Sequence, residues 1–132
     1  MRQGLAKREG STATGRPSPL HVLFICSRNR KRSPTAEALF GGRSDLEVWS
    51  AGLAPDAEEL VTPETLEWAD LVFVMEGIHS RRLQLQFRRY LRDVKVICLN
   101  IPDTFEFMAP RLIELLEGRV TPHLRSARPA NY

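Results

Sequence analysis

A cysteine and an arginine separated by five residues are the strongest chemical signal in this 132-residue chain. They begin and end the run Cys26-Ser27-Arg28-Asn29-Arg30-Lys31-Arg32. Five intervening residues can curl so that their backbone N–H groups point inward and cradle a tetrahedral anion such as phosphate. The phosphate would lie against the sulfur of Cys26, and the planar guanidinium of Arg32 could bind two of its oxygens. The same positive field stabilises a thiolate, so we expect Cys26 to be nucleophilic.

Other side chains could support this chemistry. Ser33 could donate a hydrogen bond to the thiolate, and Asn29 could brace the loop with its amide. Expelling an alkoxide or phenolate from phosphorus needs a proton donor, for which Asp103 is the best candidate and Glu106 the reserve. The alternative for Asp103 is a purely structural role in a turn. The alternative for Cys26 is that of a small buried side chain, as we also expect for Cys98.

The elements that must position this loop alternate between strand and helix. Apolar runs predict strands at residues 21–26, 46–50, 71–75 and 94–99. Cap, proline and glycine signals predict helices at 35–40, 63–68, 78–91 and 110–117, with Ser33 and Thr62 as N-caps and Gly118 as the last stop. Such alternation predicts an α/β three-layer sandwich with a four-stranded parallel sheet. The functional loops should then follow the carboxyl ends of the strands.

Composition divides the chain into a domain and two ends. Residues 1–20 carry four basic side chains and one acidic one, which accounts for the whole net charge of +3. We expect them to form a flexible basic extension, residues 21–118 to form the domain, and residues 119–132 to form a C-terminal tail. The remaining residues are balanced at fifteen basic and fifteen acidic side chains, so a nucleic-acid partner is not expected.

Several classes of protein are not expected from the residue pattern. The longest apolar runs have five residues, far fewer than the roughly 20 that cross a bilayer, so no membrane partner is expected. Two cysteines offer no disulfide framework, which favours the cytoplasm. The three histidines, His21, His79 and His123, have no metal-ligand spacing and read as surface or loop residues. We therefore expect neither a metal nor a cofactor.

Charges are unevenly distributed in the middle of the sequence. Residues 44–80 include nine acidic side chains and no lysine or arginine, whereas residues 81–95 include five arginines and one lysine against a single aspartate. Arg81 and Arg88 are seven residues apart and should share a helix face. A solvated face is the simplest interpretation, and the functional alternatives are an acidic partner, nucleic acid or a homodimer.

Residues 22–26 and 32–38 together resemble the phosphate loop of the low-molecular-weight protein tyrosine phosphatases, whose pattern is Cys-x5-Arg-Ser-Pro-x-Ala-Glu. Similar segments of a compact bacterial branch of this superfamily occur at residues 50–52, 68–75 and 101–103. The resemblance covers about residues 21–118 and implies the phosphotyrosine phosphatase I-like fold with strand order 2-1-3-4. It also implies hydrolysis of a phosphorylated protein or small phosphomonoester through a cysteinyl-phosphate. In this family Asp103 corresponds to the acid, and Phe105 stands where an aromatic side chain often lines the phosphotyrosine slot.

The sequence departs from the family pattern at several site positions. Arg28 replaces the usual glycine, Lys31 stands where a second cysteine is frequent, and Thr104 replaces the proline after the acid. Arg28, Arg30 and Lys31 should make the rim cationic, and the segment between the second and third strands is shortened. These departures leave open a catalytically weak phosphate- or phosphoprotein-binding module. Arsenate reduction is less favoured, because related arsenate reductases need two further cysteines and only Cys98 remains.

Overall fold

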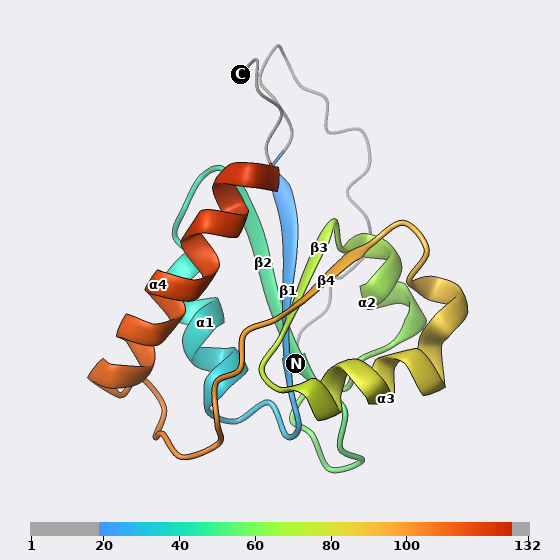
Figure 1. Cartoon of the computed structure of the whole chain (residues 1–132), viewed down its shortest axis with the longest axis horizontal. Helices are drawn as coiled ribbons and strands as arrows, with labels where there is room; N and C mark the ends of the chain where they lie inside the picture. Colours follow the sequence, from blue (N-terminus) through green and yellow to red (C-terminus); the bar gives the residue numbers. More distant parts are fainter. Residues whose placement is uncertain (1–18, 128–132) are drawn as a thin grey trace.

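A four-stranded parallel sheet with strand order β2-β1-β3-β4 forms the centre of the molecule, which confirms the predicted fold class and order. The computed structural model describes residues 19–127 (Figure 1). Within them the elements are β1 (Leu20–Cys26), α1 (Arg32–Phe40), β2 (Leu46–Gly52), α2 (Pro63–Trp68), β3 (Leu71–Val74), α3 (Gly77–Phe87), the 3₁₀ helix η1 (Arg88–Tyr90), β4 (Lys95–Cys98) and α4 (Pro110–Ala127). The expected extension lies outside the described residues except at positions 19 and 20, and Leu20 already belongs to β1.

Different helices cover the two faces of the sheet, which gives the predicted three layers. α1 and α4 lie on one face, and α2 and α3 lie on the other (Figure 1). Val22 and Phe24 of β1 pack in the first of the two hydrophobic layers, while Leu23 and Ile25 pack in the second. All four side chains are fully buried, so a strand covered on both faces explains the continuous apolar run.

The cap predictions for the first two helices had different outcomes. Thr62 caps α2 as predicted, since its hydroxyl accepts a hydrogen bond from the backbone N–H of Thr65 at 3.1 Å. Ser33 is not the N-cap of α1, because this helix already begins at Arg32 and Ser33 is buried in its first turn. The loop after β1 therefore passes directly into the helix, which brings the unpaired N–H groups of the first turn next to the loop.

The prediction that the last helix ends at Gly118 was wrong. α4 continues to Ala127, so residues 119–127 belong to the domain and not to a C-terminal tail, while residues 128–132 lie outside the described residues. The physical reason is an apolar stripe at four-residue spacing, because Leu112, Leu116, Val120 and Leu124 are all buried against the sheet. Burial of this stripe outweighs the weak helix preference of glycine.

The predicted helix at residues 78–91 is divided into two parts. α3 ends at Phe87, and Arg88 begins the 3₁₀ helix η1. Arg81 and Arg88 thus lie on consecutive helices of different pitch, and the predicted single helix face for the two was wrong. Within residues 19–127, no helix combines the length and the apolar character that crossing a membrane would require.

Candidate active site

The loop between β1 and α1 curls around the sulfur of Cys26. This side chain is 3% exposed, and its Sγ accepts a hydrogen bond from the backbone N–H of Asn29 at 3.2 Å. Asn29 has φ 56°, a left-handed conformation that turns neighbouring N–H groups toward a common centre. α1 follows at once and directs the positive end of its dipole at the same place. The arrangement suits a tetrahedral anion bound against a thiolate.

Main-chain hydrogen bonds from the segment after β2 hold this loop in place. The N–H groups of residues 53, 54 and 58 donate to the carbonyl oxygens of residues 26, 27 and 28 at 3.1, 2.8 and 3.0 Å. Gly52 makes the close approach possible, because a Cβ at this position would lie 2.4 Å from the carbonyl oxygen of Ser27 and 2.8 Å from the Cβ of Ala57. Any larger side chain at residue 52 would displace the loop.

The side chain of Arg32 is only 2% exposed, and two hydrogen bonds fix its guanidinium group. Its Nη1 donates to Oε1 of Glu76 at 2.8 Å and to the carbonyl oxygen of Ile101 at 2.7 Å. The anchoring leaves the Nε and Nη2 edge for a ligand, as bidentate binding of phosphate requires. The contact between Glu76 and Arg32 was not predicted from the sequence. The signal available in the sequence was the position of Glu76 directly after an apolar strand, where the functional loops of a parallel sheet begin.

Asp103 lies at the mouth of a pocket of about 150 Å³. The residues that line this pocket are Cys26, Arg28, Arg30, Lys31, Arg32 and Asp103. The carboxylate is 65% exposed, and its Oδ1 lies 3.7 Å from Nε of Arg32. The structure thus brings the three predicted catalytic residues, Cys26, Arg32 and Asp103, together in one pocket. Among the described residues that line the pocket, Asp103 alone carries a carboxylate.

Phe105, which the family resemblance placed in the substrate slot, is not among the residues that line this pocket. It is half-buried and packs against the hydrophobic cluster between the sheet and helices α1 and α4. Phe107, in the same loop before α4, is exposed, but it does not line the pocket either. The pocket walls are therefore charged and not aromatic.

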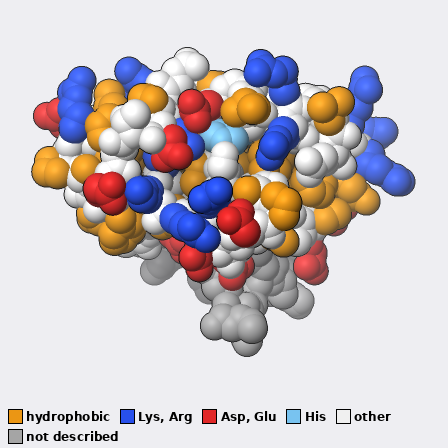
Figure 2. Space-filling view, turned by 90° about the horizontal axis from the view of Figure 1, so that it is seen from below, with side chains coloured by type: hydrophobic (Ala, Val, Ile, Leu, Met, Phe, Trp, Pro, Cys, Tyr) orange, Lys and Arg blue, Asp and Glu red, His pale blue; other side chains and the backbone are white. Residues whose placement is uncertain are grey.

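Carboxylates neutralise the rim that the sequence predicted to be cationic. Arg28 lies 3.6 Å from Asp56, and Arg30 lies 3.8 Å from Asp56 and 3.5 Å from Glu58. On the other side, Lys31 contacts Glu106 at 3.3 Å. Basic and acidic side chains accordingly lie side by side across this face of the molecule (Figure 2). Glu106 is highly exposed and is absent from the pocket lining, whereas Asp103 lines the pocket.

His79 is a site residue that sequence reasoning placed on the surface. It is 1% exposed, and its Nδ1 accepts a hydrogen bond from the backbone N–H of Glu76 at 3.0 Å. Nε2 must then carry the proton, and it donates to Oγ of Ser27 at 3.0 Å. Burial, followed by the positive charge of Arg32, lowers the pKa of His79 to about 4. The Glu76-x-x-His79 spacing of a helix capping box could have revealed this role.

Two buried polar atoms beside the cradle have no hydrogen-bond partner among the described residues. They are Oδ1 of Asn29 and Oγ of Ser33. The predicted hydrogen bond from Ser33 to the thiolate and the bracing role of the Asn29 amide remain predictions. Residues 19–127 contain no cluster of histidine, cysteine and acidic side chains that could hold a metal ion.

The chain has recognisable relatives, although no protein-family model matches it. The protein-arginine-phosphatase of Bacillus subtilis (strain 168) is 34% identical over 108 residues, and the match covers 61% of this chain and 71% of that protein. A solved structure of a YwlE mutant from Bacillus subtilis is 27% identical, with a TM-score of 0.62 over 80% of this chain and 99% of the other. A low-molecular-weight protein tyrosine phosphatase from T. tengcongensis shares the fold, with a TM-score of 0.65, 23% identity and coverage of 81% and 99%.

Proposed function

Because the chain belongs to the low-molecular-weight protein tyrosine phosphatase superfamily, we propose that it is a phosphatase that works through a cysteinyl-phosphate on Cys26. One observation carries this proposal. Cys26 shares a single pocket with an anchored arginine, Arg32, and with the carboxylate of Asp103, and a curled backbone surrounds its sulfur.

In the first step, the thiolate of Cys26 attacks phosphorus in line with the leaving atom. The S–P bond forms while the bond from phosphorus to the leaving atom breaks. The three equatorial oxygens accept hydrogen bonds from backbone N–H groups of residues 27–32 and from Nε and Nη2 of Arg32. Because Glu76 and Ile101 hold the opposite edge, the guanidinium needs little reorganisation when phosphate binds.

Asp103 moves the protons in both steps. It protonates the leaving atom during the first step and becomes a carboxylate. In the second step this carboxylate takes a proton from water, the water oxygen bonds to phosphorus, and the S–P bond breaks. Inorganic phosphate leaves, while the Cys26 thiolate and the protonated Asp103 are regenerated.

The Asp103→Asn variant tests this mechanism. Turnover of phosphotyrosine, a poor leaving group, should fall by about 10²- to 10⁴-fold, whereas turnover of p-nitrophenyl phosphate should fall much less, because its leaving anion needs less protonation. The basic limb of the pH profile of kcat/KM should also disappear. Activity should persist in EDTA, since no step uses a metal ion.

The Glu106→Gln variant is the matched control and should behave like the wild type. A larger loss of turnover for phosphotyrosine than for p-nitrophenyl phosphate in Glu106→Gln, but not in Asp103→Asn, would reassign the acid to Glu106. Vanadate binding without turnover between about pH 5 and 8 would contradict the phosphatase proposal and would favour the binding module.

A phosphorylated protein side chain is the proposed substrate, with phosphotyrosine as the first candidate from the family resemblance. Phosphoarginine is the second candidate, because the curated relative is a protein-arginine-phosphatase and because none of the described residues that line the pocket is aromatic. A guanidinium leaving group could approach the carboxylate of Asp103. The ratio of kcat/KM for phosphotyrosine and phosphoarginine peptides with identical flanking residues decides between them.

A further inference from the structure

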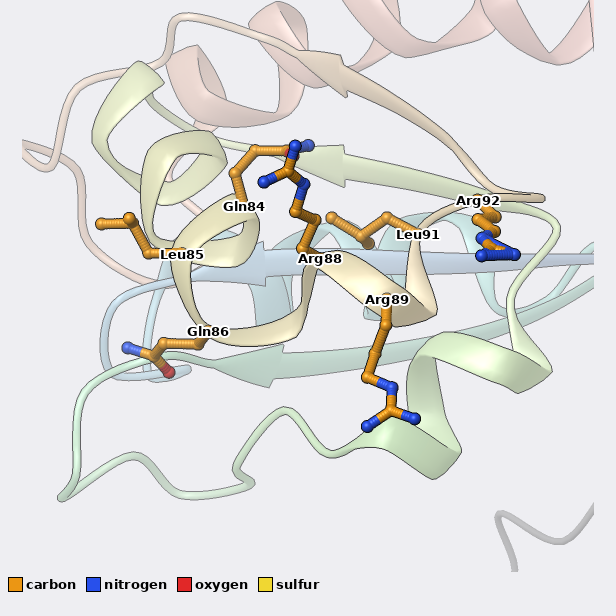
Figure 3. Close-up of a pocket in the computed structure, with 7 residues that line it drawn as sticks. All are labelled: Gln84, Leu85, Gln86, Arg88, Arg89, Leu91 and Arg92. Atoms are coloured by element: carbon orange, nitrogen blue, oxygen red, sulfur yellow. The ribbon is translucent and has the colours of Figure 1, made fainter.

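A second hollow, separate from the catalytic pocket, lies along the end of α3 and across η1. Its volume is about 630 Å³, and its lining includes Leu85, Leu91, Arg88, Arg89 and Arg92 (Figure 3). The three guanidinium groups point in different directions from the η1 region, so they are spread along the surface and do not converge on one point. This spacing suits an extended ligand with several negative charges better than a single small anion.

The arginines of this hollow differ from those around the active site. Arg28, Arg30 and Arg32 each form an ion pair with a carboxylate. Arg88, Arg89 and Arg92 form none with any carboxylate in residues 19–127, although Arg89 lies over the ring of Tyr90. Lys and Arg side chains accordingly gather over α3 and η1 at the right-hand edge of the face in Figure 2. Positive charges that lack acidic partners within the domain attract acidic groups from outside it.

An apolar contact accompanies these charges. Leu85 is 85% exposed, the highest exposure of any large hydrophobic side chain described, and it lines the same hollow. A protein segment can supply both carboxylates for the arginines and an apolar side chain for Leu85. A nucleic acid fits less well, because its continuous phosphates would also meet Glu67, Asp70 and Asp93, which line the adjoining hollow with Arg89 and Arg92.

The position of α3 links this hollow to the catalytic pocket. The helix begins directly after Glu76, which holds Arg32, and its eleven residues extend about 16 Å toward the hollow. An extended peptide spans that distance with about five residues. We propose that the α3–η1 hollow docks an acidic segment of the phosphorylated protein substrate, at least about five residues from the phosphorylated side chain. This proposal rests on the proposed phosphatase function.

Direct binding can be measured without catalysis. The probe is a fluorescein-labelled, unphosphorylated peptide of alternating glutamate and leucine, and its anisotropy is titrated with the full chain at low and high salt. Arg88→Glu combined with Arg92→Glu should weaken binding at least about tenfold. The control Arg111→Glu, a charge reversal at another exposed arginine on α4, should change binding less than about twofold.

Three results would overturn the docking proposal. These are an equal loss of binding in the control, no binding by the wild type, and tighter binding of a single-stranded oligonucleotide of equal charge. Dimerisation of the wild type that the double variant abolishes, measured by sedimentation, would likewise show that a second copy and not a substrate occupies the hollow.

Kinetics separates the failure of this proposal from failure of the proposed function. The double variant should lower kcat/KM only for phosphopeptides with glutamates five or more residues from the phosphorylated side chain, and it should leave p-nitrophenyl phosphate turnover unchanged. Absence of p-nitrophenyl phosphate turnover in the wild type would contradict the phosphatase function, whereas the anisotropy result would still decide the docking site. Equal kcat/KM values for peptides with and without the acidic segment would contradict docking alone.

Discussion

Replacing His79 by glutamine should remove a pH dependence that the buried imidazole imposes on the stability of the fold. The pKa of His79 is about 4 in the folded protein, against 6.5 for an unperturbed histidine, because burial and the nearby Arg32 disfavour the charged ring. As the pH falls below 6.5, the unfolded chain takes up the proton first, so stability is lost between about pH 6.5 and pH 4. The gap between the two pKa values corresponds to at most about 3 kcal/mol.

Urea unfolding of the wild type and His79→Gln at several pH values measures this contribution. Glutamine can still donate to Oγ of Ser27 but leaves the N–H of Glu76 without its acceptor, so the variant should be about 1 kcal/mol less stable at pH 7.5. That deficit should shrink, and then reverse, as the pH falls toward 4. Other protonating groups are shared by the two proteins and cancel in the comparison.

His21→Gln is the control, because His21 lies near the start of β1, at the end of the strand opposite Cys26. This variant should retain the pH-dependent contribution of His79 to stability. A difference between wild type and His79→Gln that stays constant from pH 7.5 to pH 4.5 would refute the reasoning. It would mean that the imidazole is not held neutral by its surroundings.

Three glycines should respond differently to replacement by alanine. Gly52→Ala should lower kcat/KM for p-nitrophenyl phosphate about tenfold or more, because the added Cβ would meet the carbonyl oxygen of Ser27 at 2.4 Å. Gly42→Ala is the control and should leave kcat/KM unchanged, because a Cβ at this position meets nothing within 4 Å. Gly118→Ala should raise the free energy of unfolding by about 0.5–1 kcal/mol, because this glycine lies inside α4 with open space around it. Destabilisation by Gly118→Ala in urea unfolding would instead indicate a helix end at this residue.

Local patterns were sufficient to predict the sheet and the cradle. Strands buried on both faces appear as continuous apolar runs, and the Thr62-Pro63 signal marks the start of α2. Cys26 and Arg32 could be paired from the sequence because both belong to one short loop, so their spacing fixes their proximity. The strand order came from the family resemblance, since residue pattern alone does not fix which strands are neighbours.

Features that depend on long-range packing could not be predicted in this way. The contact of Arg32 with Glu76 and the contact of Ser27 with His79 join residues far apart in the chain. Phe105 was assigned to the pocket by analogy, but packing against the hydrophobic cluster decides its position. The end of α4 was misplaced because a glycine was given more weight than the apolar stripe on both sides of it.

The rim shows the same limitation for charges. Three basic residues within four positions of the loop indicated a cationic surface. Their carboxylate partners come from the segment after β2 and from the loop before α4, which only the folded structure brings together. The number of basic residues in the loop therefore did not predict the net charge of the rim.

The central claim is that phosphate passes through the sulfur of Cys26, and trapping the intermediate tests it most directly. Wild-type protein is mixed with p-nitrophenyl phosphate, quenched in acid within one turnover, digested, and analysed by mass spectrometry. The peptide that contains Cys26 should carry one phosphoryl group, and Cys26→Ala should show neither this adduct nor turnover. Sustained turnover by Cys26→Ala, with the phosphoryl group on another residue or on none, would contradict the account.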